Sequence, residues 1–195
     1  MRRANKDPAS TILLNKLIYQ ENNSTKNRMI SEILLKEQKN FCAYTDEYIS
    51  VTDAKDVEHF NPSFKNTSKD NYSNWFIVKH QWNKEKASKW NNFQPIMHPT
   101  ADDFEERIIY LEGDYLVSSE LDVEAKNLIS LLQLDNVLLA EKRKIYIERR
   151  KKHIEISNME ARLYFKELIS EEPFNVHYTR AIKEEFGIDV WEMIN

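Results

Sequence analysis

Residues 56–90 have the sequence DVEHFNPSFKNTSKDNYSNWFIVKHQWNKEKASKW, and five polar residues in this segment form a regular pattern. Glu58 directly precedes His59, Asn74 follows fifteen residues after His59, and Asn83 follows nine residues after Asn74. Lys86 comes three residues after Asn83, so both side chains lie on one face if this segment is helical. These five residues are the first candidates for a functional site.

The apolar pattern predicts short elements around this group. Residues 41–51 favour a hairpin that leads into it, residues 61–73 are polar and predict an exposed loop, and residues 75–78 predict a strand. Residues 82–91 can form a short helix. The predicted order is therefore strand, loop, strand, helix.

The residue types suit hydrolysis of a phosphodiester bond, which requires a base to activate water and a cation to stabilise the leaving oxygen. His59 can act as the base, because a neutral imidazole accepts a proton near pH 7. Glu58 and Asn83 offer hard oxygen ligands of the kind that Mg²⁺ and Mn²⁺ prefer. Neighbouring residues of a strand point to opposite faces, so Glu58 and His59 share a site only if the strand ends or bends there. The Asn61-Pro62 pair predicts such an ending.

A carboxylate beside a His, then Asn, then His or Asn, at about these intervals, is the signature of the HNH (ββα-metal) nucleases, and this segment resembles that family. The resemblance implies a site for one Mg²⁺ or Mn²⁺ ion, with Glu58 and Asn83 as its ligands. It also implies that Asn74 orients the loop bearing the catalytic His59. Lys86, on the face of Asn83, is expected to contact the phosphate.

The resemblance extends over residues 40–155, which look most like the PtuB-type nucleases. Proteins of that type are the nuclease partners of ABC-type ATPases in Septu and retron-associated antiphage systems. The resemblance therefore implies an ABC-type ATPase as a partner subunit.

The chain departs from the family pattern at the positions of a structural zinc site. Many HNH proteins of this kind carry two CxxC pairs, but the matching positions here hold Cys42 and Thr45, then Lys79 and Trp82. Three of the four thiolates are missing, so we expect no structural zinc. Hydrophobic packing by Trp82 and neighbouring aromatic residues is expected in its place.

Length and composition limit the remaining possibilities. The chain of 195 residues suits one domain with a real core, since 41% of its residues are apolar. No apolar run reaches the length of a membrane span, and residues 1–10 lack the apolar core of a signal peptide, so we expect a cytoplasmic protein without membrane association. The single Cys42 excludes an internal disulfide, and the two glycines, Gly113 and Gly187, exclude a glycine-rich phosphate loop.

The charge is uneven along the chain. A formal net charge of −4 argues against a protein that coats nucleic acid by bulk electrostatics. Residues 142–152 (KRKIYIERRKK) nevertheless hold seven basic residues against one acidic residue. Such a run is either a solvated helix face or, beside a nuclease motif, a phosphate-binding segment. The residues expected to bind nucleic acid are Lys84, Lys142, Arg143, Arg149 and Arg150.

We expect an α+β protein in which a ββα-metal HNH core with small hairpins is embedded in a predominantly helical chain. Residues 1–40 predict a helical hairpin, with helices over 8–20 and 25–38. Residues 41–120 are expected to hold the HNH core and a following hairpin that turns at Glu112-Gly113-Asp114. Residues 121–195 predict a helical region, with helices over 122–133, 136–156, 158–170 and 176–187.

The expected function is that of a metal-dependent HNH endonuclease that hydrolyses nucleic-acid phosphodiesters, with DNA favoured as substrate. It is expected to serve as the effector subunit of an ATPase-coupled antiphage defence system. Two alternatives stay open. The same centre could act on RNA such as tRNA, because its chemistry does not require a 2′-hydroxyl. A degenerate HNH scaffold could instead serve as a binding module.

Overall fold

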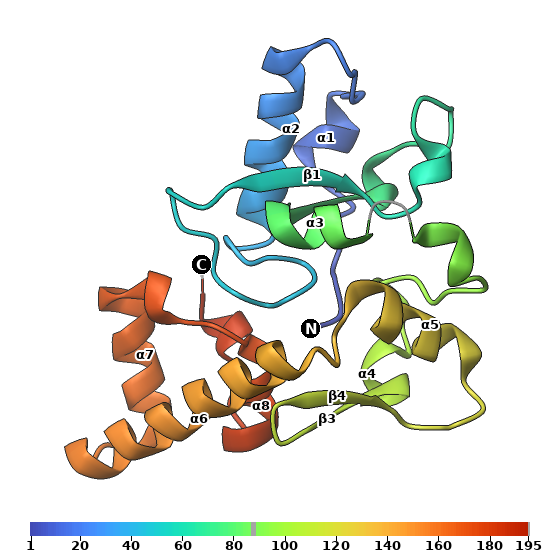
Figure 1. The fold of residues 1–195 in the computed structure, drawn as a ribbon. Coiled ribbons are helices and arrows are strands. Elements are labelled where there is room, and N and C mark those ends of the chain that lie inside the picture. Colours follow the sequence, from blue (N-terminus) through green and yellow to red (C-terminus); the bar gives the residue numbers. More distant parts are fainter. Residues whose placement is uncertain (87–88, 195) are drawn as a thin grey trace.

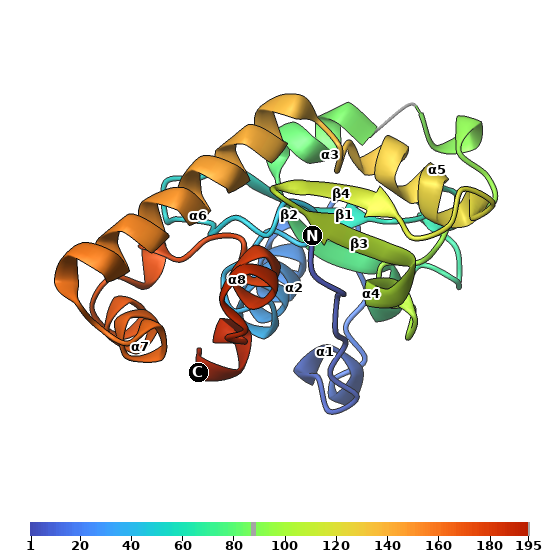
Figure 2. The ribbon, with the colours of Figure 1, turned by 90° about the horizontal axis from the view of Figure 1, so that it is seen from below.

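The structure, a computed structural model, describes residues 1–86 and 89–194. Over these residues the chain is an α+β protein with eight α-helices and two small antiparallel sheets (Figures 1 and 2). The strands are β1 (Lys55–His59), β2 (Trp75–Lys79), β3 (Ile108–Leu111) and β4 (Asp114–Val117). The helices are α1 (Thr11–Leu14), α2 (Ser24–Glu37), α3 (His80–Lys86), α4 (Phe104–Arg107), α5 (Val123–Leu132), α6 (Val137–Ser157), α7 (Ala161–Glu171) and α8 (Thr179–Phe186).

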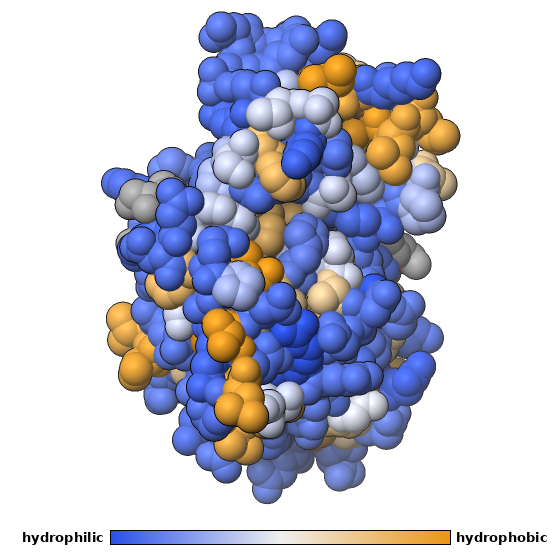
Figure 3. Space-filling model, turned by 90° about the vertical axis from the view of Figure 1, so that its right-hand side faces the viewer, coloured by the Kyte–Doolittle hydropathy of each residue, from blue (hydrophilic) through white to orange (hydrophobic). Residues whose placement is uncertain are grey.

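The first helix is much shorter than the predicted range 8–20, and that prediction was wrong. α1 ends at Leu14, and Lys16 has a left-handed φ of 48°, which a continuing right-handed helix does not allow. Leu13 and Ile18, which lie on the apolar side of an amphipathic helix over this range, are 45% and 63% exposed. Apolar side chains accordingly gather at the top of the face shown in Figure 3, where α1 lies. α2, in contrast, agrees with its predicted range.

The hairpin predicted over residues 41–51 is reduced to a single bridge between Phe41 and Tyr48. The reason is the loop between them, in which Asp46 has a left-handed φ of 58° and its buried carboxylate binds α8. The Oδ1 and Oδ2 atoms of Asp46 accept hydrogen bonds from Thr179 Oγ1 and Arg180 N, each 2.9 Å long. This loop is therefore held by α8 and by one hydrogen bond to β2, which Ala43 N donates to the Ile77 carbonyl oxygen at 3.0 Å.

The second hairpin matches its prediction. β3 and β4 pair from Leu111 opposite Asp114, and the turn residues Glu112 and Gly113 have φ of 47° and 98°. Positive φ at both positions is typical of a type I′ turn. A Cβ on Gly113 would lie 2.6 Å from the carbonyl oxygen of Ala140 in α6, so the close approach of hairpin and helix also requires glycine.

Two hydrophobic cores hold the elements together. The first surrounds β2, where Trp75, Phe76, Ile77 and Val78 are all buried, and it takes in side chains from α2, β3, β4 and α5. The second lies among α6, α7, α8 and the segment that follows α8. Trp82 of α3 packs against both cores. Among the described residues, no helix combines the length and apolar content that crossing a membrane requires.

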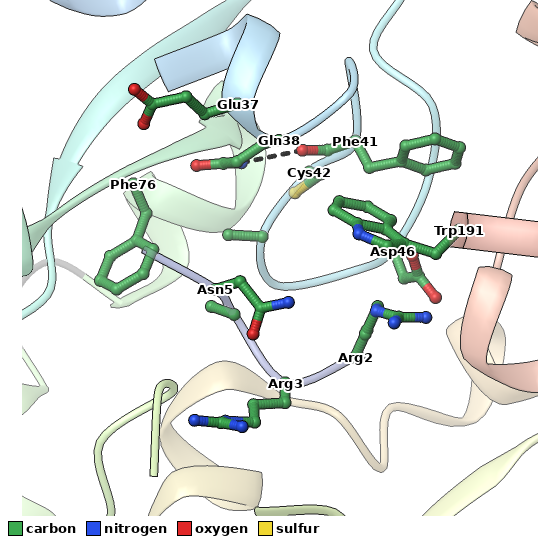
Figure 4. A pocket seen from close by; sticks show the side chains of 12 residues that line it. Arg2, Arg3, Asn5, Glu37, Gln38, Phe41, Cys42, Asp46, Phe76 and Trp191 are labelled. Carbon is green, nitrogen blue, oxygen red and sulfur yellow. Dashed lines mark hydrogen bonds between the residues drawn. The ribbon is translucent and has the colours of Figure 1, made fainter. Parts of the chain in front are cut away.

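The N-terminal segment runs between these parts of the molecule (Figure 4). Arg2 Nη1 donates to Asp189 Oδ1 at 2.8 Å, and its guanidinium lies 5.0 Å from the ring centroid of Trp191. Beside it lies a small hollow of about 30 Å³, lined by the N-terminal segment, the loop containing Phe41 and Cys42, and Trp191. This hollow contains neither His59 nor Asn83 and is separate from the candidate site.

Candidate functional site

The candidate site lies on a β–β–α unit formed by β1, β2 and α3. β1 and β2 are antiparallel, with His59 opposite Trp75 and Glu58 opposite Phe76, and α3 follows β2 directly. The strand ends at His59, after which Asn61 accepts from Ser63 N at 3.0 Å and begins a short turn, η1 (Pro62–Phe64). The chain bends where the Asn-Pro pair predicted it.

His59 is held by a carboxylate that sequence reasoning missed. Its Nδ1 lies 2.8 Å from Oδ1 of Asp70, and the same oxygen accepts from Trp75 Nε1 at 2.7 Å and from Asn74 Nδ2 at 3.1 Å. An ionised carboxylate only accepts hydrogen bonds, so this contact places the proton of a neutral imidazole on Nδ1. Nε2 is then the basic nitrogen, and it is buried without a hydrogen-bond partner among the described residues.

Asn74 lies behind His59 and fixes the turn after it. Its Oδ1 accepts from the backbone N–H of Asn61 at 2.7 Å, and its Nδ2 donates to the carbonyl oxygen of Asn61 at 3.2 Å. Asn74 is buried, so its amide is available for this internal role and not for substrate. Asn74 therefore fixes the backbone of the turn that follows His59.

Glu58 and Lys86 form a buried ion pair. Nζ of Lys86 contacts Oε1 of Glu58 and donates to the carbonyl oxygen of His59 at 3.0 Å, while Tyr44 Oη donates to Glu58 Oε1 at 3.3 Å. Burial raises the pKa of the Glu58 carboxyl, an effect that Lys86 opposes, and burial lowers the pKa of Lys86. The side chain of Lys86 is only 4% exposed. Its expected role as a phosphate contact is therefore corrected to that of a partner for Glu58.

Asn83 points toward a second carboxylate of β1. Its Nδ2 donates to Asp56 Oδ2 at 2.9 Å, and the same oxygen lies 2.8 Å from Nδ1 of His80. This contact leaves the amide oxygen of Asn83 available to a cation. Asp56 stands two residues before Glu58, on the same face of the strand, so strand alternation is the signal that could have identified it.

These side chains line one open hollow of about 380 Å³. The hollow brings together four of the five predicted residues, while Asn74 supports it from behind. Tyr19 closes one side, with its ring 4.7 Å from the imidazole of His59 and nearly perpendicular to it. The lining residues are Tyr19, Asp56, Val57, Glu58, His59, Pro62, Lys65, Asn83 and Lys86.

The donor set of the hollow fits a Mg²⁺ or Mn²⁺ ion in chemical type. Asp56 and Glu58 carry carboxylates and Asn83 an amide oxygen, and Mg²⁺ commonly takes one or two carboxylates with water completing its shell. Glu58 would share its carboxylate with Lys86. Within the described part of the chain, no three His, Cys, Asp or Glu side chains group closely enough to hold a metal ion by themselves.

The basic residues expected to bind nucleic acid have different surroundings. Lys84 on α3 and Lys142 and Arg149 on α6 are exposed. Arg150 is half-buried, and its Nη1 donates to Tyr164 Oη at 2.9 Å. Arg143 is fully buried, and its Nη2 donates to the carbonyl oxygen of Leu134 at 2.6 Å. The prediction that Arg143 binds nucleic acid is wrong, because its side chain does not reach the surface.

Two of the four positions compared with the cysteine pairs, Cys42 and Lys79, are in contact. Cys42 Sγ accepts from the backbone N–H of Lys79 at 3.4 Å, and Nζ of Lys79 lies 3.3 Å from Asp53 Oδ2. Trp82, at the last of the four positions, packs into both hydrophobic cores. Lys79 thus takes part in an ion pair and Trp82 in apolar packing.

Comparisons of this chain with protein families, with curated proteins and with solved structures found no match.

Proposed function

We propose that this chain is a metal-dependent endonuclease of the ββα-metal type. The observation that carries the proposal is the environment of His59. One nitrogen of its ring is fixed by Asp70, and the other is buried and unpartnered in a hollow that also contains the oxygen donors of Asp56, Glu58 and Asn83. A base held in one tautomer beside hard oxygen ligands suits hydrolysis of a phosphodiester.

In this proposal His59 Nε2 takes the proton from the attacking water, and Asp70 stabilises the imidazolium that forms. Asp56, Glu58 and Asn83 would hold the divalent ion, which supplies charge neutralisation at the scissile phosphate and the leaving oxygen when bound. The more exposed lysine of the hollow is Lys65, whose side chain is 40% exposed and whose Nζ lies 2.8 Å from Glu21 Oε1. In this proposal Lys65 exchanges Glu21 for the phosphate and takes the contact first expected of Lys86.

DNA is the favoured substrate, and an ABC-type ATPase is the proposed partner, in an antiphage defence system. The net charge of −4 supports a nuclease that receives its substrate with help from a basic partner surface. Full cleavage activity of the isolated chain would count against the partner.

The test compares wild type with His59→Ala on plasmid DNA, single-stranded DNA and total RNA, with Mg²⁺ or Mn²⁺. The chain is tested alone and together with any ATPase encoded beside its gene. His153→Ala serves as a matched control, since His153 is exposed on α6 and lies outside the hollow. We expect the His59 variant to lose roughly 10²–10⁴-fold in rate and the control to keep wild-type activity. The preferred substrate then decides between DNA and RNA.

A binding module is the second candidate, and the Glu58–Lys86 ion pair favours it, because that pair occupies one proposed metal ligand. Calorimetric titration with Mn²⁺ separates the two candidates. Metal binding that is lost in Asn83→Ala supports the nuclease. No metal binding, together with no cleavage of any substrate, supports the binding module.

A further inference from the structure

A second open hollow, of about 370 Å³, lies along α6 and shares no lining residue with the His59 hollow. One wall is formed by α6, which contributes Lys142, Tyr146, Arg149 and Arg150. The opposite wall comes from the loop before β1 and from the segment that precedes α8, including His177. Three segments far apart in the sequence therefore build this site.

The basic side chains that line this hollow fall into two groups, those without an ion-pair partner and one that is fixed by hydrogen bonds. Lys142 and Arg149 are two helical turns apart on one face of α6, and neither forms an ion pair with a described residue. Arg150 is held in place, because its Nη1 and Nη2 donate to Tyr164 Oη at 2.9 Å and to the Asn175 carbonyl oxygen at 3.2 Å. Its guanidinium also lies 4.6 Å from the ring centroid of Tyr146.

The neutral groups of the hollow add a hydrogen-bond donor. Nδ1 of His177 accepts from the backbone N–H of Tyr48 at 3.0 Å, so a neutral His177 carries its proton on Nε2 and donates from there. The lining residues described include one acid, Glu47. Its carboxylate is already engaged by Tyr178 Oη at 3.1 Å and lies 3.8 Å from Nζ of Lys79. The groups of the hollow that remain available to a ligand are thus the basic side chains of Lys142 and Arg149 and the Nε2–H donor of His177.

We propose that the hollow along α6 is a binding site for a phosphate group. Arginine and lysine together with a neutral N–H donor suit a phosphate, whose oxygens only accept hydrogen bonds when ionised. If the proposed nuclease function holds, the natural source is a phosphate of the substrate backbone outside the cleaved bond. α6 and α3 lie on the same side of the molecule (Figures 1 and 2), so one nucleic acid can contact both helices.

The experiment measures binding by full-length His59→Ala protein, which keeps the hollow along α6 intact. The probes are fluorescent single-stranded and duplex oligonucleotides over a range of salt concentrations, and inorganic phosphate and adenosine monophosphate followed by the His177 ring signals in NMR. Lys142→Gln/Arg149→Gln is compared with Lys152→Gln/Lys166→Gln. The second pair has the same change in charge, is exposed, and lies outside the hollow.

We expect the Lys142/Arg149 pair to weaken oligonucleotide binding roughly tenfold and to reduce the salt slope by about 2, while the control pair changes affinity less than about twofold. If phosphate or adenosine monophosphate binds and the oligonucleotides do not, the site stands and its phosphate group comes from a small phosphorylated molecule. Equal effects of the two pairs, or no binding of any probe, would overturn the proposal. If the wild type binds at the hollow but cleaves nothing, the proposed nuclease function fails while the phosphate site stands.

Discussion

At the scale of single residues, the contact between Asp70 and His59 determines which nitrogen of the imidazole is basic. Asp70→Asn keeps the shape but replaces one acceptor oxygen by a donor, so the Nδ1–H tautomer loses its preference. We expect cleavage to fall roughly 10²–10⁴-fold, with little change in the denaturation midpoint. Cleavage rates and the ¹⁵N signals of His59 check this. Wild-type rates together with an unchanged tautomer in the variant would contradict it.

The buried pair of Glu58 and Lys86 predicts strong coupling between these two side chains. Lys86→Met leaves the Glu58 carboxylate buried without its partner, which should cost about 3–5 kcal/mol in urea unfolding. Glu58→Gln/Lys86→Met removes both charges and should recover most of that loss. Arg28→Met breaks the exposed pair with Glu32 and should cost no more than about 0.5 kcal/mol. A double variant as unstable as Lys86→Met alone would show that the ion pair is not the cause.

The sequence identifies the functional residues unevenly. Glu58, His59 and Asn83 stand at recognisable intervals, and the structure places them around one hollow. Asp70 carries no such signal, because an Asp between Lys69 and Asn71 in a polar loop is an ordinary turn residue. The burial of Arg143, in contrast, could have been predicted from its spacing along the helix. This residue stands four residues from Leu139 and from Ile147, and the three form the buried face of α6.

At the scale of elements, the hairpin β3–β4 predicts a steric effect at its turn. Gly113→Ala combines a positive φ with a Cβ contact on Ala140, whereas Gly187→Ala has a positive φ of 68° and no atom within 4 Å. The Gly187 variant should lower the free energy of unfolding by about 1–2 kcal/mol, because of its positive φ alone. The Gly113 variant should lower it clearly more. Thermal unfolding of the two variants measures the difference. Equal costs would mean that α6 moves aside freely.

Local signals explain which elements were predicted correctly. Asn136 caps α6 by accepting from Leu138 N and Leu139 N, and Asn158 ends this helix with a left-handed φ of 52°. The hairpin over residues 107–118 has its glycine at the turn. The segment 41–51 lacks such a local determinant. Its shape depends on α8, more than a hundred residues away, and this contact has no counterpart in the local pattern.

At the scale of the whole molecule, acid should weaken the fold through two half-buried imidazoles, His98 and His177. Burial, together with nearby Lys79 and Arg150, lowers the pKa of His177 to about 4, and burial does the same for His98. The unfolded chain therefore takes up these protons first, and stability falls as pH drops from about 6.5 to about 4. A lowering of the His177 pKa from 6.5 to about 4 corresponds to roughly 3–4 kcal/mol of stability before solvent screening, which reduces it.

Urea unfolding as a function of pH tests this effect. His177→Gln should flatten the pH dependence between about pH 6.5 and 4 relative to wild type, because glutamine takes up no proton. His153→Gln, at an exposed position of α6, should leave the wild-type slope unchanged. Parallel curves for His177→Gln and wild type would contradict the prediction.

The anchoring of the loop before β1 also sets an order of events during protein synthesis. Asp46 leaves the ribosome long before Thr179 and Arg180, which bind its carboxylate. The β1–β2–α3 unit can pair early, because its partners are close in the chain, but the Asp46 carboxylate of the loop beside it lacks Thr179 and Arg180 until α8 has been translated. A nascent chain that stalls before α8 thus carries the residues of the site on an unfinished support. In a protein proposed to cut nucleic acid, this delay would keep incomplete chains from folding into the working enzyme.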